Sequence, residues 1–65
     1  MQWTDEVILA LLKGADERLT KRERANLLGD FTIEEIIRYS ARAEQLYHDG
    51  MAIGDIATTL AAESR

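Results

Sequence analysis

Residues 28–36 read Leu-Gly-Asp-Phe-Thr-Ile-Glu-Glu-Ile, and they contain the clearest helix start in the chain. Thr32 and Glu35 have the spacing of a capping box, in which each side chain bonds to the backbone N–H of the other residue. A phenylalanine before the cap and an isoleucine one turn later are placed as a hydrophobic staple. We therefore predict a long helix over residues 33–48, ended by the Asp-Gly pair that follows it.

Similar signals predict three further helices. A second capping box, Thr20 with Glu23, opens a short helix that we expect to end at Gly29 in a left-handed conformation. A threonine cap followed by two acids predicts a first helix from Asp5 towards Gly14. The last helix follows a weak alanine cap and carries one narrow apolar stripe. The members of this stripe are Ile53, Ile56, Ala57 and Leu60.

The connections between these helices decide the fold class. Proline is absent and apolar residues recur every three or four positions, so the periodicity indicates helix throughout. The joints at 28–32 and 48–52 are so short that successive helices must cross and share one core. We predict an all-α fold in which residues 1–65 form a single helical domain. It is a compact bundle of about four helices, three long and one short, with helix-turn-helix-like joints.

The composition favours a binding protein over an enzyme. The chain has no cysteine and a single histidine, His48, which cannot anchor a metal centre by itself. A nucleophile, a base and a group that orients the base are not found together at a catalytic spacing. We predict no enzyme activity, no cofactor and no metal. A core built from 65 residues is small, so we expect association with another protein, including a second copy in a homodimer.

Charge and hydropathy restrict the partners and the compartment. The apolar content of 46% with 31% charged residues is typical of a folded globular domain. The formal net charge of −4 disfavours a chain built mainly to hold phosphates. No apolar run approaches the length of a membrane span, and the N-terminus lacks the pattern of a signal peptide. We expect no membrane partner and a cytoplasmic location, in a cell or in the cytosol of a virus-infected host.

Two predicted helices carry more apolar surface than one small core requires. Residues 7–12 are apolar without interruption, so either the first helix lies at the centre of the bundle or part of it faces a partner. On the helix over residues 33–48, apolar side chains cover about half of the circumference, which core filling explains for most of them. Residues at the margins of these apolar faces are our candidates for contact with a partner. The predicted protein interface consists of Trp3, Leu9, Tyr39 and Leu46.

Residues 50–60, Gly-Met-Ala-Ile-Gly-Asp-Ile-Ala-Thr-Thr-Leu, resemble the turn and first DNA-side helix of bacterial trihelical helix-turn-helix regulators. In that family a further helix enters the major groove, whereas this chain ends about where that helix would begin. Residues 3–6 together with 28–36 also resemble the Myb or SANT type of three-helix domain, although the later tryptophans of that family are absent. These resemblances imply a DNA-binding regulator as the alternative function.

A DNA-binding role would depend on a small set of bases. Two of them lie on the helix over residues 33–48, which begins with Glu34 and Glu35 and would bring these acids against phosphates. The candidate nucleic-acid contacts are Lys21, Arg22, Arg24, Arg38 and Arg42. We predict instead a small protein-binding regulatory or antagonist module, homodimeric and of phage or bacterial type. A helix-turn-helix transcriptional regulator is the alternative.

Overall fold

A computed structural model describes residues 3–12 and 19–64, and these residues form four helices and no strand. The helices are α1 (Asp5–Leu11), α2 (Lys21–Leu27), α3 (Ile33–His48) and α4 (Ile53–Glu63). The predicted all-α bundle of four helices is therefore confirmed. The first helix is shorter than expected. α1 has seven residues, as many as α2. Gly14, where we expected α1 to weaken, lies outside the described residues.

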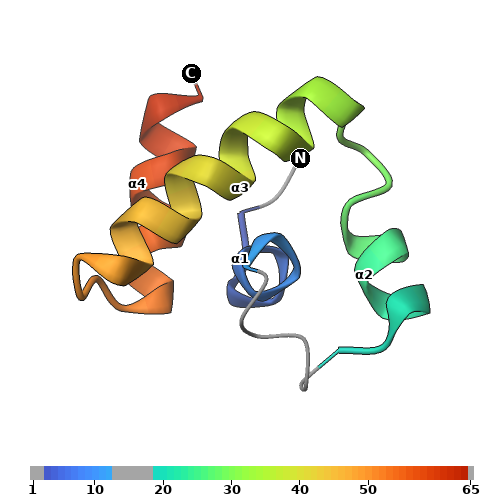
Figure 1. Cartoon of the computed structure of the whole chain (residues 1–65), viewed down its shortest axis with the longest axis horizontal. Helices are drawn as coiled ribbons and strands as arrows, with labels where there is room; N and C mark the ends of the chain where they lie inside the picture. Colours follow the sequence, from blue (N-terminus) through green and yellow to red (C-terminus); the bar gives the residue numbers. More distant parts are fainter. Residues whose placement is uncertain (1–2, 13–18, 65) are drawn as a thin grey trace.

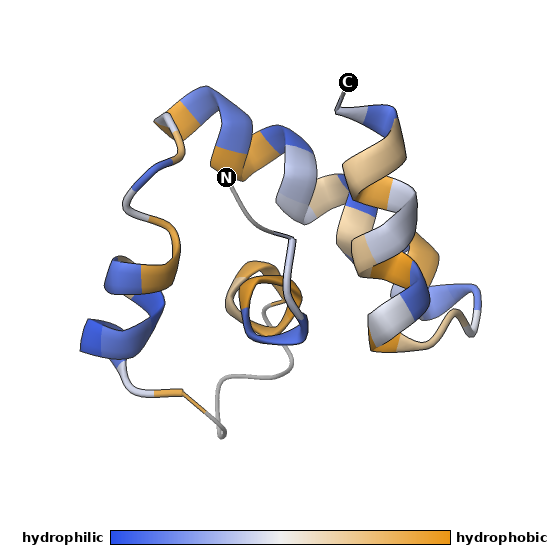
Figure 2. Cartoon of the chain, turned by 180° about the vertical axis from the view of Figure 1, so that it is seen from behind, coloured by the Kyte–Doolittle hydropathy of each residue, from blue (hydrophilic) through white to orange (hydrophobic). Residues whose placement is uncertain are grey.

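α1 lies at the centre of the bundle and packs against each of the other three helices. In Figure 1 it is seen end-on, with α2, α3 and α4 arranged around it. Figure 2 shows that α1 is hydrophobic around most of its circumference and that α2 turns its hydrophilic side away from it. A helix apolar nearly all round is normally buried on several sides. The central position therefore explains the uninterrupted apolar run of residues 7–12.

The core is apolar throughout the described part of the chain, where no polar or charged side chain is buried. It is formed chiefly by α1 and α4, with contributions from α3 and from the α2–α3 connection. The most deeply buried side chains are Ile8, Leu11, Leu12, Ile56 and Leu60. Among the described helices, none combines the length and the apolarity needed to cross a membrane.

Both predicted capping boxes are present. Thr32 Oγ1 accepts a hydrogen bond from the Glu35 backbone N–H at 3.1 Å, and Thr32 N–H donates to Glu35 Oε1 at 2.9 Å. Thr20 and Glu23 form the same two bonds, at 3.1 Å each. The side chain of Thr4 caps α1 as expected. Each of these helix caps joins residues only three positions apart, so the sequence pattern alone is sufficient to specify them.

We expect Thr32→Ala to lower the free energy of unfolding by about 1 kcal/mol, because it leaves a backbone N–H of α3 without its cap. Thr58→Ala is the matched control. Thr58 lies exposed within α4, where its hydroxyl donates only to the Gly54 carbonyl, and alanine is the better helix former there. Urea unfolding followed by circular dichroism measures both variants. Equal midpoints for the two would contradict a stabilising box at Thr32.

The two short joints end their helices differently. After α3, Gly50 adopts φ 95°, and the N–H groups of Gly50 and Met51 donate to carbonyls of the last turn of α3. This is a Schellman motif, which requires the left-handed conformation that glycine adopts freely. The prediction that Gly29 adopts a left-handed conformation is wrong, because Gly50 is the one glycine with positive φ among the described residues. The chain instead leaves α2 through a turn in which Phe31 N–H donates to the Leu28 carbonyl.

Candidate functional site

The large hydrophobic side chains that are exposed in the described structure all belong to α3. Ile33 is 77% exposed, Ile37 66% and Tyr47 54%. At 100° per residue they fall within roughly 80° of arc, on a line about 21 Å long. Ser40 and Glu44 lie between them, so the five residues follow the 4, 3, 4, 3 spacing of one helix face. We call these five residues the α3 stripe.

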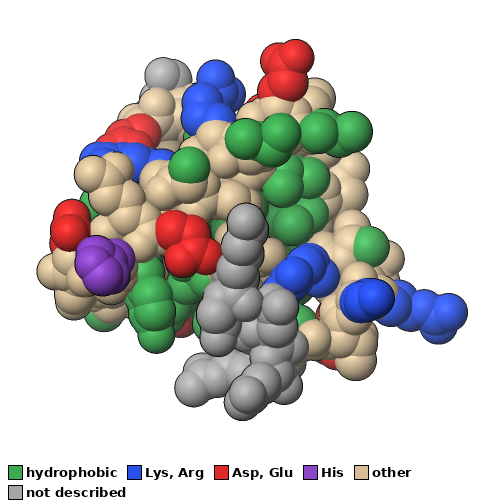
Figure 3. Space-filling model, in the orientation of Figure 1, with side chains coloured by type: hydrophobic (Ala, Val, Ile, Leu, Met, Phe, Trp, Pro, Cys, Tyr) green, Lys and Arg blue, Asp and Glu red, His purple; other side chains and the backbone are tan. Residues whose placement is uncertain are grey.

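The α3 stripe is distinct from the face of α3 that enters the core. Ala43 and Leu46 are buried against the core, with Ile36 and Tyr39 half-buried beside them. This core face lies roughly 100° around the helix from the stripe. Figure 3 shows hydrophobic side chains on the surface over the first half of α3. The helix therefore has two apolar faces. One packs into the core, and the described residues cover little of the other.

None of the four predicted interface residues belongs to the α3 stripe. Leu46 is only 7% exposed and belongs to the core, so it offers little surface to a partner. Leu9 is half-buried on the central helix. The sequence analysis assigned most apolar side chains of this helix to the core and so missed Ile33, Ile37 and Tyr47 as candidates. The signal that could have found them is the width of the apolar face, which exceeds what the neighbouring helices cover.

The other two predicted interface residues, Trp3 and Tyr39, are brought together within the molecule. Their ring centroids are 5.0 Å apart at an interplanar angle of 84°. Phe31 completes the cluster, 5.5 Å from Trp3 and 5.9 Å from Tyr39, also edge to face. Such aromatic pairs stabilise beyond the area they bury. The cluster ties the segment before α1 to the start of α3, and so fixes the orientation of the α3 stripe.

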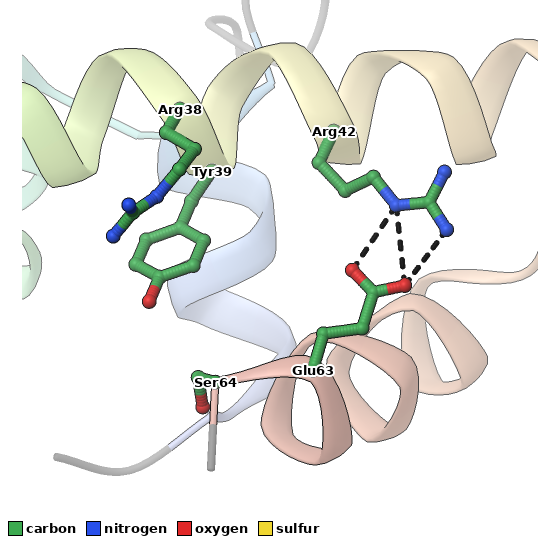
Figure 4. Close-up of a pocket in the computed structure, with 5 residues that line it drawn as sticks. All are labelled: Arg38, Tyr39, Arg42, Glu63 and Ser64. Carbon is green, nitrogen blue, oxygen red and sulfur yellow. Dashed lines mark hydrogen bonds and ion pairs between the residues drawn. The ribbon is translucent and has the colours of Figure 1, made fainter.

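A groove of about 400 Å³ lies between α3 and α4, lined by Arg38, Tyr39, Arg42, Glu63 and Ser64 (Figure 4). Arg42 donates to the Glu63 carboxylate through Nη2 at 2.7 Å and through Nε at 3.1 and 3.2 Å. The guanidinium carbon of Arg38 lies 5.1 Å from the centre of the Tyr39 ring. Two cations of the groove thus already have partners within the chain.

The pair formed by Arg42 and Glu63 shifts both side chains towards their charged forms. The hydrogen bond to Glu63, with its negative charge, raises the pKa of Arg42 above its ordinary value. The hydrogen bond from Arg42 lowers the pKa of Glu63, against a smaller opposing effect of desolvation. Both side chains are substantially exposed, so solvent screens the interaction. The pair links α3 to the end of α4.

We expect the contact between Arg42 and Glu63 to add a small, acid-sensitive contribution to stability. Because folding lowers the pKa of Glu63, the contribution is present above the ordinary carboxyl pKa of about 4.3 and is lost as the pH falls through the lower folded value. The melting temperature of the native sequence should therefore fall more on acidification than that of Glu63→Gln. Arg42→Gln with Glu63→Gln should behave as Glu63→Gln alone. Parallel acid curves for native and variant chains would contradict this contact.

The candidate nucleic-acid contacts lie on two different helices. Arg38 and Arg42 line the α3–α4 groove, whereas Lys21 and Arg22 are exposed on α2 with Arg24 half-buried beside them. A second, smaller hollow of about 180 Å³ lies at the start of α2 and includes Lys21 and Arg24. Figure 3 shows Lys and Arg side chains in separate places on the visible face. The candidate bases therefore divide into an α2 group and an α3 group.

Within residues 3–12 and 19–64, no group of three or more His, Cys, Asp or Glu side chains is placed to hold a metal ion. Comparison with protein-family models, curated proteins and solved structures finds no significant match.

Proposed function

We propose that this chain is a small non-enzymatic protein-binding module, of a regulatory or antagonist kind, that binds its partner through the α3 stripe. The observation that carries the proposal is the alignment of Ile33, Ile37 and Tyr47 on one line of one helix. Single exposed hydrophobic residues are common on soluble proteins and need no explanation. Several large exposed hydrophobic side chains on one helix face, by contrast, are typical of interaction sites.

The energetics of the α3 stripe support this proposal. Burying one fully exposed isoleucine is worth roughly 1.5 to 3 kcal/mol, so Ile33 and Ile37 can anchor a complex between them. Tyr47 adds an aromatic side chain of the type enriched at interface centres. The helix that presents them is fixed at both ends, by the capping box at its start and the Schellman motif at its end. A rigid surface loses little conformational entropy on binding, which favours affinity.

The proposal is tested by affinity capture from an extract of the native host, quantified by mass spectrometry. The test variant combines Ile33→Gln with Ile37→Gln, which removes the apolar anchors at exposed helical positions. Ala62→Gln is the matched control, because Ala62 is exposed on α4 away from the stripe. Circular dichroism should show all three proteins folded. We expect a partner that the native chain and Ala62→Gln retain and that the double variant loses by at least about tenfold. Identical recoveries from all three would overturn the proposal.

Binding to a second copy of the chain, as a homodimer, can be tested with the purified protein alone. The small core would gain stability from association, and the α3 stripe is the exposed apolar surface that a second copy could cover. Sedimentation equilibrium of the native chain and of the variant with Ile33→Gln and Ile37→Gln measures this directly. If self-association is the function, the native chain dimerises and the double variant is a monomer. A native chain that stays monomeric at high concentration would exclude a second copy as the partner.

The alternative function, a helix-turn-helix DNA-binding regulator, has one observation in its favour. α3 and α4 are joined by a tight turn over residues 49–52, as in a helix-turn-helix unit. The charges oppose it, because Arg42 is held by Glu63 and the net charge is −4. We expect duplex DNA to be bound weakly and without sequence preference, with fluorescence anisotropy falling steeply as salt rises. A tight, site-specific complex at physiological salt would instead establish the alternative.

A further inference from the structure

We infer that the element that binds the α3 stripe is an amphipathic helix of a partner protein, with basic residues beside its apolar face. The inference rests on the proposed function, because it takes the α3 stripe as the binding surface. It adds the secondary structure and the charge of the bound segment. Three features of the molecule support it: the spacing of the stripe, the size of the stripe and the charges beside it.

The spacing of the α3 stripe favours a helix as the bound element. Side chains that recur at 4, 3, 4, 3 along a helix form the ridge that a second helix packs against, at a crossing angle near 20°. The stripe extends over about four helical turns, which matches an ordinary docked helix. The backbone N–H and C=O groups in the middle of α3 are engaged within the helix, so an extended strand would gain no main-chain hydrogen bonds there.

The size of the α3 stripe favours a single helix over the broad face of a second folded domain. A stable interface between two folded proteins buries about 800 Å² on each side and involves about 20 to 30 residues per partner. The stripe offers one line of five residues, of which three are large and apolar. Recognition of an amphipathic helix in this manner requires only a few apolar anchors at helical spacing.

The charges beside the α3 stripe favour a basic partner. Glu34 is exposed and lies roughly 60° around α3 from Ile37, and the exposed Asp30 precedes the helix. Arg38 follows Glu34 by one helical turn, but its guanidinium lies against the Tyr39 ring. Arg42 is paired with Glu63 on the α4 side. Lys and Arg flanking the apolar face of a docked helix would therefore meet acidic residues.

Two synthetic helical peptides test this inference. Both carry leucine at the spacing of the α3 stripe, and they differ only in having lysine or glutamate at the flanking positions. Fluorescence anisotropy measures the affinity of each for the full chain at low and at high salt. We expect the lysine peptide to bind at least about tenfold more tightly than the glutamate peptide, with the preference shrinking as salt rises. Glu34→Gln should reduce the preference, and Ile33→Gln with Ile37→Gln should abolish binding of both peptides.

The outcomes separate this inference from the proposed function. If both peptides bind equally and both require Ile33 and Ile37, the stripe is a binding surface and the inference of a basic partner is wrong. If the lysine peptide binds the double isoleucine variant with the same affinity as the native chain, the binding is nonspecific charge attraction. The inference of a helix docked on the stripe is then wrong. If neither peptide binds, but host capture still depends on the isoleucines, the proposed function stands and the helical partner is wrong. Unchanged affinities with Ala62→Gln complete the supporting result.

Discussion

Replacing Leu12 by Glu is expected to unfold the domain, whereas replacing Leu9 by Glu should leave its helical fold in place. Leu12 is 1% exposed at the end of the central helix, within the apolar core. A carboxylate buried there without a partner costs several kcal/mol, which is comparable to the whole stability of a small domain. Leu9 is half-buried, so a glutamate at that position can keep its carboxylate in water. Its cost should be about 1 to 2 kcal/mol of lost apolar burial.

Circular dichroism at 25 °C and thermal melting compare these two variants on the same helix. The expected pair of results is a flat, low-helix melt for Leu12→Glu and a cooperative melt at a reduced temperature for Leu9→Glu. A cooperative Leu12→Glu protein with native helix content would show that α1 is not the centre of the core. Loss of the fold in both variants would show that the Leu9 side of α1 is as tightly enclosed as the Leu12 side.

Replacing Phe31 by Ala should lower the free energy of unfolding by about 3 kcal/mol or more. Phe31 is 9% exposed and packs against the rings of both Trp3 and Tyr39, so its removal leaves a cavity and breaks two edge-to-face contacts. Phe31→Leu is the control, because it retains most of the apolar volume and loses the aromatic geometry. Its cost should be about 1 kcal/mol.

Urea unfolding of the Phe31 variants can be followed by tryptophan fluorescence, because Trp3 is the single tryptophan of the chain and contacts Phe31 directly. The alanine variant should also bind more weakly through the α3 stripe, since the start of α3 loses its anchor. A Phe31→Ala protein as stable as Phe31→Leu would mean that the cluster does not hold the start of α3.

The sequence predicted well those features that depend on neighbours along the chain. The boxes at Thr20 and Thr32 and the turn at Gly50 each involve residues within a few positions, and all three are present. The central place of α1 could be stated only as one of two alternatives. It became definite because three other helices pack around α1, an arrangement that no local pattern contains.

The candidate site was less predictable, because it depends on which apolar residues remain uncovered. A helical wheel groups Ile33 and Ile37 with Leu46 as parts of one wide apolar face, yet the positions of α1 and α4 bury Leu46 and leave the isoleucines exposed. The contact between Arg42 and Glu63 spans 21 residues and exists only because α3 and α4 cross. Exposure and long-range pairing are properties of the packed helices, so the sequence alone could not assign them.

Photocrosslinking in the native host can show whether the α3 stripe touches a partner protein. A benzophenone amino acid is placed at Ile37 in one protein and at Ala62 in another, and both are irradiated in living cells. The benzophenone reacts with groups in immediate contact, so adducts report which surface touches a partner. The proposed function predicts a discrete protein adduct from position 37 and none from position 62. Adducts from position 62 alone, with none from position 37, would contradict it.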